Sequence, residues 1–84
     1  MITVHYFASV REAMARESEQ LELPKSVNSV SDLLDFLSGQ NSALQALSND
    51  ENRILVAVNQ TVVDQSYTLS ENDEVALFPP MTGG

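Results

Sequence analysis

The clearest structural signal in this 84-residue chain is an apolar stripe of helical spacing near its middle. Val30, Leu33, Leu34 and Leu37 lie at positions i, i+3, i+4 and i+7, so a helix would place all four on one face. The chain has no cysteine, and no disulfide can supplement the packing of that face. We therefore predict that residues 1–84 form one domain, held together by packing against this helix.

The residues that follow the stripe indicate where the helix begins and ends. Asp32 lies near the positive N-terminal end of the predicted helix, and Gly39 is placed to cap its C-terminus. Leu44 and Leu47 indicate one further helical turn, and residues 49–52 are interpreted as an exposed loop.

Strand-length runs surround the helix on both sides. Ile2, Val4 and Tyr6 alternate with polar residues, so we expect these three side chains to face the core. The Asn59-Gln60 pair predicts a tight turn between strands. The predicted strands fall within residues 2–8, 18–24, 53–59 and 74–79.

A short helix is predicted directly after the first strand. It should begin at about Ser9, because Ser9 and Glu12 have the spacing of a capping box. Pro24 is expected to end the second strand, since proline cannot donate to a strand ladder. The resulting order predicts an α+β fold in which one main helix packs across a small mixed sheet.

Charge restricts the partners that such a chain can bind. Twelve acidic residues against four basic ones give a formal net charge of −8. This balance disfavours nucleic acid and anionic membranes, and it suits a basic protein partner. No apolar run is long enough to span a bilayer, and the first residues do not resemble a signal peptide. We expect a cytoplasmic protein, in agreement with the absence of cysteine.

Few residues can support catalysis within the chain. His5 is the only histidine, and there is neither a cysteine nor a glycine-rich phosphate loop. We interpret His5 as a surface residue without a role. Glu71, Asp73 and Glu74 lack the spacing of a calcium loop and are interpreted as a solvated turn, so no metal site is predicted.

Two aromatic residues break the pattern of their strands. Phe7 and Phe78 alternate onto the face opposite the apolar residues of their own strands. If those strands are neighbours, both rings form an exposed apolar patch that Val62 would join, and such a patch is typical of a protein interface. Two alternatives stay open at this point: a helix covers that face, or a bulge reverses the phase of Phe78.

The C-terminal residues form the most unusual segment, an extended tail over residues 79–84. It consists of Pro79, Pro80, Met81, Thr82, Gly83 and Gly84. The prolines prevent the sheet from continuing, and the glycines lack side chains that would clash in a narrow channel. Glycine is achiral and cannot racemise when its carboxylate is activated, so the pattern points to the α-carboxylate of Gly84 as a reacting group. The alternative is a frayed terminus without function.

Two segments carry a family resemblance. Residues 1–12, MITVHYFASVRE, and residues 58–84, VNQTVVDQSYTLSENDEVALFPPMTGG, closely resemble the MoaD family of ubiquitin-like proteins, the small sulfur-carrying subunits of molybdopterin synthase. The family has a β-grasp fold, in agreement with the predicted order of elements. One departure is Met81, where the family more often has a small β-branched residue.

The resemblance implies a sulfur carrier that is not an enzyme by itself. An E1-like adenylyltransferase would use ATP to convert the Gly84 carboxylate to an acyl-adenylate, and sulfur would then replace the adenylate to give a thiocarboxylate. The chain itself would bind no cofactor. The tail, residues 79–83, would enter the active site of the large synthase subunit.

The large subunit would use two such sulfurs to convert cyclic pyranopterin monophosphate to molybdopterin. The resemblance also implies a heterotetramer of two small and two large subunits, with the catalytic residues on the large one. Partner contacts would fall on Phe7, Val62 and Phe78.

Three other functions share parts of this pattern. The first is a sulfur carrier for thiamine or tRNA thiolation, which would use the same chemistry at its C-terminus. The second is a ubiquitin-like protein modifier, whose chemistry would begin with the same activation. The single lysine, Lys25, leaves little scope for self-linked chains. The third is a plain interaction domain with an inert tail.

Overall fold

The computed structural model describes residues 1–48 and 54–79 and contains a mixed sheet of five strands. The strands are β1 (Ile2–Tyr6), β2 (Ser18–Leu21), β3 (Leu55–Val58), β4 (Thr61–Val63) and β5 (Glu74–Phe78). Their order is β2-β1-β5-β3-β4. The first and last strands, β1 and β5, pair in parallel at the centre, and the other pairs are antiparallel.

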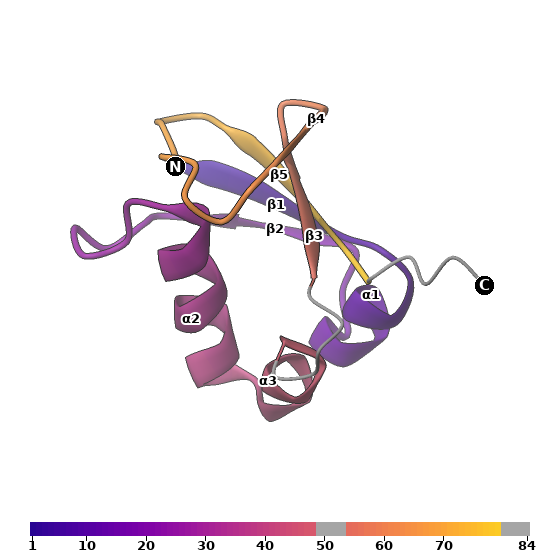
Figure 1. Ribbon diagram of the computed structural model, residues 1–84. Coiled ribbons are helices and arrows are strands. Elements are labelled where there is room, and N and C mark those ends of the chain that lie inside the picture. The colour runs from indigo at the N-terminus through magenta and orange to yellow at the C-terminus, as the bar shows by residue number, and fades with distance from the viewer. Residues whose placement is uncertain (49–53, 80–84) are drawn as a thin grey trace.

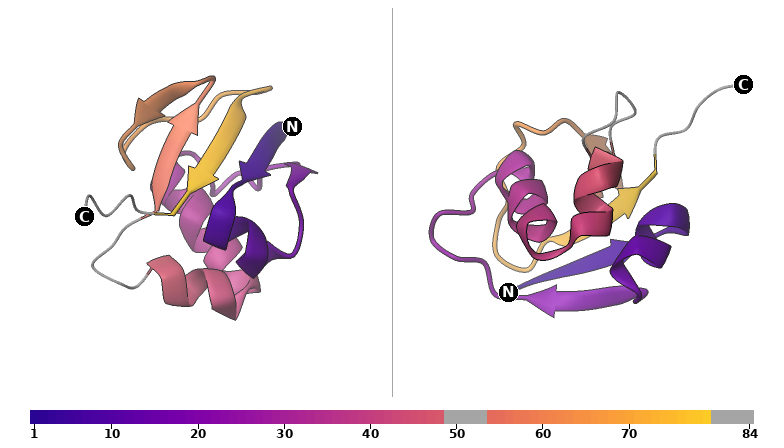
Figure 2. Two further views of the ribbon diagram at one scale, coloured as in Figure 1. Left: turned by 90° about the vertical axis from the view of Figure 1, so that its right-hand side faces the viewer. Right: turned by 90° about the horizontal axis from the view of Figure 1, so that it is seen from below.

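The helices leave one face of the sheet uncovered within the described residues. They are α1 (Ala8–Met14), α2 (Val30–Gln40) and α3 (Ser42–Ser48). Helices α2 and α3 lie under the sheet in Figure 1 and in front of it in Figure 2, right, whereas α1 lies at the end of β1. The predicted α+β fold, with one main helix across a mixed sheet, is confirmed.

The core lies between the sheet and the helices. All four residues of the apolar stripe, residues 30, 33, 34 and 37, are buried, as predicted. Ile2, Val4 and Tyr6 are also buried, which confirms the face expected for the first strand. The Tyr6 hydroxyl donates a hydrogen bond to Glu19 Oε2 over 2.6 Å. Burial raises the pKa of Tyr6 well above its usual range, and the Glu19 carboxylate raises it further.

A capping box fixes the start of α2. The Asp32 N–H donates to Ser29 Oγ over 3.1 Å, and Asp32 Oδ2 accepts from the Ser29 N–H over 3.2 Å and from the Asn28 N–H over 3.0 Å. The backbone N–H groups of Asn28 and Ser29 lower the pKa of Asp32 below its usual value. The helix therefore begins at Val30, where the apolar stripe also begins.

The predicted cap at Gly39 is wrong, because α2 continues through Gln40 and ends at Asn41. Asn41 has an extended backbone, so the helix end requires no left-handed glycine. The Asn41 amide nitrogen donates to the Ala13 carbonyl over 3.1 Å, and Asn41 Oδ1 accepts from the Leu44 N–H over 3.0 Å. This residue thus joins α1, α2 and α3. The predicted extra helical turn is confirmed by α3, whose Leu44 is fully buried, and the predicted loop at residues 49–52 lies outside the described residues.

The predicted capping box at Ser9 and Glu12 is wrong, although the short helix exists. The N-cap of α1 is Phe7, with no side-chain cap, because β1 passes directly into the helix. The Phe7 N–H still donates to the Leu77 carbonyl of β5 over 3.1 Å. Strand β1 therefore ends at Tyr6, earlier than predicted. Strand β2 ends at Leu21, so the prediction that Pro24 ends it is wrong.

The β3–β4 turn is fixed to the loop before β5. Asn59 and Gln60 have φ values of 51° and 71°, which confirms the predicted tight turn. The Asn59 side chain donates to Asp73 Oδ1 and accepts from the Glu74 N–H, each over 3.0 Å, and Asp73 Oδ2 accepts from the Ser70 N–H over 2.8 Å. Asp73 is only 7% exposed, so the interpretation of this loop as a solvated turn is wrong at Asp73.

Candidate functional site

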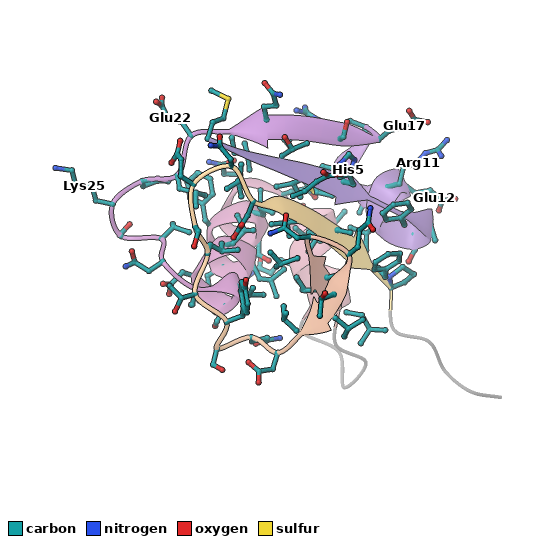
Figure 3. All side chains as sticks on the ribbon, turned by 90° about the horizontal axis from the view of Figure 1, so that it is seen from above. His5, Arg11, Glu12, Glu17, Glu22 and Lys25 are labelled. Carbon is teal, nitrogen blue, oxygen red and sulfur yellow. The ribbon has the colours of Figure 1, made fainter. Side chains whose placement is uncertain are left out.

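The outer face is the side of the sheet that faces away from α2 and α3, and Figure 3 looks onto it. His5 of β1 is labelled there, and alternation places Phe7 on the same face of the chain. On β5 the outward residues are Glu74, Ala76 and Phe78, because Val75 and Leu77 between them are buried.

Phe7 and Phe78 stack against each other on this outer face. Their ring centroids are 4.6 Å apart and their planes differ by 6°. Phe7 is 43% exposed and Phe78 is partly exposed. Within the described residues no helix covers the rings, and β5 keeps a regular register with β3 without a bulge. The prediction of an outward aromatic pair is therefore confirmed.

Val62 lies on the same face, beyond the aromatic pair. It is 74% exposed on β4 and pairs with Ala57 of β3, which in turn pairs with Ala76 of β5. These positions surround a hollow of about 480 Å³. Its lining residues are His5, Phe7, Ala57, Gln60, Val62, Glu74, Ala76 and Phe78. The structure thus brings the three predicted interface residues to one hollow.

Residues that the sequence reasoning missed extend this surface. Leu55 is 40% exposed and lies opposite Phe78 in the β3–β5 register. Ala57 and Ala76, which pair across β3 and β5, also line the hollow. Alternation along residues 55–58 would place Leu55 and Ala57 on the same face. The run is apolar throughout, however, so the sequence does not distinguish its outer face from its inner one.

A polar pair lies at the rim of the hollow. His5 Nε2 is 3.0 Å from Glu74 Oε1, and the two side chains are 35% and 61% exposed. His5 is therefore partly buried within the candidate site rather than freely exposed. Its prediction as a residue without a role is not tested by this geometry.

The predicted tail begins directly after a residue of this surface. Pro79 follows Phe78 directly and is partly buried. The remaining tail residues, Pro80, Met81, Thr82, Gly83 and Gly84, lie outside the described residues. Phe78 belongs to the stacked pair and is the last residue of β5, so the aromatic surface directly precedes the tail in the sequence.

Basic side chains near α1 are already engaged with acidic ones. Arg11 and Glu17 approach to 3.5 Å, and Arg16 donates to Glu19 over 3.1 Å. Figure 3 shows Arg11 and Glu17 at the α1 end of the molecule. Within the part of the chain that the structure describes, Arg11 and Arg16 are thus paired with carboxylates. The full sequence has twelve acidic residues against four basic ones.

Neither a membrane helix nor a metal cluster occurs in the described ranges. In residues 1–48 and 54–79 no helix is long and apolar enough to cross a membrane. The same residues contain no group of three or more His, Cys, Asp and Glu side chains that could hold a metal ion.

The sheet order, the central parallel pair of first and last strands and the helix across one face define a β-grasp protein of the ubiquitin-like class. Its free sheet face and the proline that follows the last strand are the candidate site. The chain belongs to the ThiS family, whose model matches residues 4–84.

Two curated relatives match along their whole length. The molybdopterin synthase sulfur carrier subunit of Escherichia coli (strain K12) is 38% identical over 84 residues, which cover 100% of both chains. The subunit of the same name from Haemophilus influenzae is 33% identical over 84 residues, again with 100% of both chains covered.

Solved structures share the fold. The putative molybdopterin converting factor, subunit 1 from Pyrococcus furiosus has a TM-score of 0.77 at 26% identity, covering 95% of this chain and 97% of that one. The small archaeal modifier protein 1 of Haloferax volcanii gives the same values. The complex of subunits 1 and 2 of the molybdopterin-converting factor from Helicobacter pylori 26695 contains a chain of this fold, with a TM-score of 0.65 at 19% identity and coverage of 99% and 97%.

Proposed function

We propose that this chain is the sulfur-carrier subunit of a molybdopterin synthase and carries its sulfur on Gly84. The observation that carries this proposal is the full-length match to relatives that bear that name, at 38% and 33% identity. The structure adds support because Phe78, the last residue of β5, belongs to the exposed apolar surface and directly precedes the tail. We also propose that residues 1–84 form one domain with residues 79–84 as its tail.

The proposed chemistry takes place at the α-carboxylate of Gly84. A carboxylate oxygen attacks the α-phosphorus of ATP, pyrophosphate leaves, and an acyl-adenylate forms. Hydrosulfide then attacks the acyl carbon and loses its proton, AMP leaves, and the acyl group becomes a thiocarboxylate. This replaces one difficult substitution by two easier ones. ATP binds to the activating partner, and the carrier holds no cofactor of its own.

The proposed partners are an E1-like adenylyltransferase and the large synthase subunit, in a heterotetramer of two small and two large subunits. The stacked rings and Val62 would contact each partner, while Pro79 directs the tail into its active site. The net charge of −8 would favour docking to a basic surface. We place the protein in the cytoplasm, where the nucleotide and the partners would be present.

A reconstitution experiment tests this function. The chain is activated with the adenylyltransferase, ATP and a sulfur source, and is then mixed with the large subunit and cyclic pyranopterin monophosphate. Formation of molybdopterin is expected with the full chain and is expected to stop when Gly84 is deleted. Equal product from the deleted chain would contradict a role for Gly84.

A protein-modifier function is the second candidate, because a small archaeal modifier protein shares the fold and 26% of its sequence. Such a modifier would be found attached through Gly84 to lysines of other proteins. Mass spectrometry of cell extracts separates the two functions, since a sulfur carrier is not expected to leave Gly-Gly remnants on lysine. A carrier for thiamine or tRNA thiolation would instead copurify with a different acceptor protein.

A further inference from the structure

One asparagine side chain attaches the β3–β4 turn to the start of β5. Asn59 Nδ2 donates to Asp73 Oδ1, and Asn59 Oδ1 accepts from the Glu74 N–H, each over 3.0 Å. The Asn59 N–H also donates to the Glu74 carbonyl over 2.8 Å. An asparagine amide has one donor group and one acceptor, and here both are used. We call the side chains of Asn59 and Asp73 the latch.

Asp73 is held in place independently of Asn59. Its Oδ2 atom accepts from the Ser70 N–H over 2.8 Å, and its backbone carbonyl accepts from the Thr3 N–H of β1 over 3.1 Å. The residue is only 7% exposed. A buried carboxylate that loses a hydrogen-bond donor keeps the cost of its burial. Asp73 is therefore a fixed acceptor to which the turn is attached.

Strand β4 depends on the latch because its turn end has few other contacts. The strand has three residues, lies at the edge of the sheet and pairs only with β3. A two-stranded pairing of this length is marginal by itself. The chain after β4 is attached separately to α2, because the Ser31 N–H donates to the Gln65 carbonyl over 2.9 Å. Loss of the latch would thus free the turn end of β4 and leave the rest of the fold in place.

The turn end carries residues of the candidate site, whereas the tail begins at the other end of β5. Gln60 and Val62 line the hollow, and Val62 is 74% exposed, so core packing does not fix its position. The latch meets β5 at its first residue, Glu74, and the tail follows its last residue, Phe78. A change at the latch therefore affects Val62 without altering the residue that precedes the tail.

We propose that Asn59 and Asp73 are positioning residues, which hold the turn end of β4 in one arrangement before the large synthase subunit binds. The inference rests on the proposed function. A surface that is already ordered loses less conformational entropy when a partner binds. The latch then determines how tightly the large subunit binds, and not how fast sulfur leaves Gly84.

Exchanging the two residues tests this role. Asn59→Asp brings two carboxylates together. In Asp73→Asn, whichever way the new amide turns, its N–H group faces another N–H group, at Asn59 or at Ser70. In the double variant, the amide at position 73 donates to the carboxylate at position 59, while the Glu74 and Ser70 N–H groups keep their acceptors. Asn59 has φ 51°, a left-handed conformation that aspartate also adopts, and the double variant has the net charge of the wild type.

Order in β4 and affinity for the large subunit are measured on the same variants. Amide hydrogen exchange at residues 60–62 is expected to accelerate in each single variant, with exchange in β1 unchanged. Titration calorimetry is expected to show a Kd for the purified large subunit that is about three- to tenfold higher, the size expected for ordering one or two side chains on binding. The double variant is expected to restore both values. Faster exchange throughout the chain would indicate general destabilisation and would overturn the proposal.

Asp64→Asn is the matched control for charge. Asp64 directly follows β4 and accepts from the Ser66 N–H, but it does not belong to the latch. This variant removes one carboxylate beside the same strand, as Asp73→Asn does, and is expected to leave Kd unchanged. An equal increase in Kd for Asp64→Asn and Asp73→Asn would show that charge alone is responsible and would contradict the latch.

The rate of sulfur transfer separates positioning from catalysis. Thiocarboxylated chain is mixed at saturating concentration with the large subunit and cyclic pyranopterin monophosphate, and the first turnover is followed. Molybdopterin formation in both single variants is expected within about twofold of the wild-type rate, because only binding is weakened. A much slower first turnover together with an unchanged Kd would overturn the proposal.

The two hypotheses fail in different ways. If the wild-type chain does not bind the large subunit, the proposed function fails. If the wild type binds and both single variants bind equally tightly, the proposed function stands and the latch has no positioning role. A double variant that binds as weakly as the single variants also rejects the latch.

Discussion

At the scale of single residues, the outer face depends on a few side chains that break the core pattern of their strands. Phe7 and Phe78 stack at 4.6 Å although neither is needed to fill the core. An exposed, pre-stacked aromatic pair is stabilised by its own contact and presents a rigid apolar surface to a partner. Such a pair is more useful for binding than for folding.

Alanine substitutions at Phe7 and Phe78 are expected to separate the role of these rings in partner binding from their role in folding. Each variant should weaken binding to the large synthase subunit by about 1–3 kcal/mol, as for an aromatic residue at the centre of an interface, with a smaller loss in the free energy of unfolding. Titration calorimetry and thermal unfolding measure the two effects. Tyr67→Ala is the control, because Tyr67 is exposed but outside the hollow. A similar loss of binding in Tyr67→Ala would contradict a localised surface.

At the scale of elements, α2 determines how the chain folds over its sheet. Its apolar stripe supplies much of the core, and the Ser29–Asp32 capping box defines where that stripe begins. The Ser29 hydroxyl accepts the Asp32 N–H, and the Asp32 carboxylate accepts two backbone N–H groups. These bonds satisfy donors that a helix N-terminus otherwise leaves without partners.

Variants at the α2 cap are expected to show how much the capping box contributes to the free energy of unfolding and how that contribution depends on pH. Ser29→Ala should lower the free energy of unfolding by about 1 kcal/mol. The pKa of Asp32 is lowered by the backbone N–H groups of Asn28 and Ser29, so its contribution is present above the ordinary value of 3.8 and is lost as the pH falls through the folded-state pKa.

The stability difference between the wild type and Asp32→Asn, from urea unfolding, should therefore be largest near neutral pH and diminish below pH 3.8. Asp64, whose pKa is also lowered, is unchanged in both proteins and cancels in this difference. A difference that is constant from neutral to acidic pH would show that the Asp32 charge does not stabilise the cap.

Patterns of local spacing predicted the elements better than their ends. The stripe at residues 30–37 correctly predicted a helix, and the alternation at Ile2, Val4 and Tyr6 correctly predicted a strand. Burial on one face of an element imposes a fixed period on its apolar residues. The caps at Ser9 and Gly39 were wrong, since the β5 pairing of Phe7 and the contacts of Asn41 decide those ends. The Phe7–Leu77 bond and the Asn41–Ala13 bond are tertiary interactions that no local motif contains.

The candidate site was predicted only in part for the same reason. Phe7 and Phe78 were visible because each breaks an alternating pattern. Leu55, Ala57 and the buried Asp73 were not visible, because their positions depend on which strands become neighbours and in which register. The residues that line the hollow come from four strands, β1, β3, β4 and β5, and its two alanines have no signature along the sequence.

At the scale of the whole molecule, helices α2 and α3 cover one face of the sheet, and the core lies between them and the sheet. The opposite face carries the hollow that Phe7, Val62 and Phe78 line. The chain as a whole carries a formal net charge of −8. Long-range attraction to a basic partner would bring the two proteins together, and the aromatic pair would then retain the complex.

We accordingly expect that salt weakens binding to the large subunit mainly by lowering the association rate. Stopped-flow measurements should show an association rate that falls by about tenfold or more between low salt and physiological ionic strength, where the Debye length is about 8 Å. The dissociation rate should change much less. An association rate that does not vary with ionic strength would contradict electrostatic steering.

The mass of the intact chain tests the central claim, that Gly84 carries sulfur, most directly. The chain is purified from cells that contain the activating enzyme and is compared with a chain that lacks Gly84. The expected result is a fraction of the full chain that is heavier by the difference between a sulfur and an oxygen atom, with the added mass on the C-terminal peptide and absent from the deleted chain. The full chain remaining entirely unmodified in repeated preparations with active enzyme would contradict the claim.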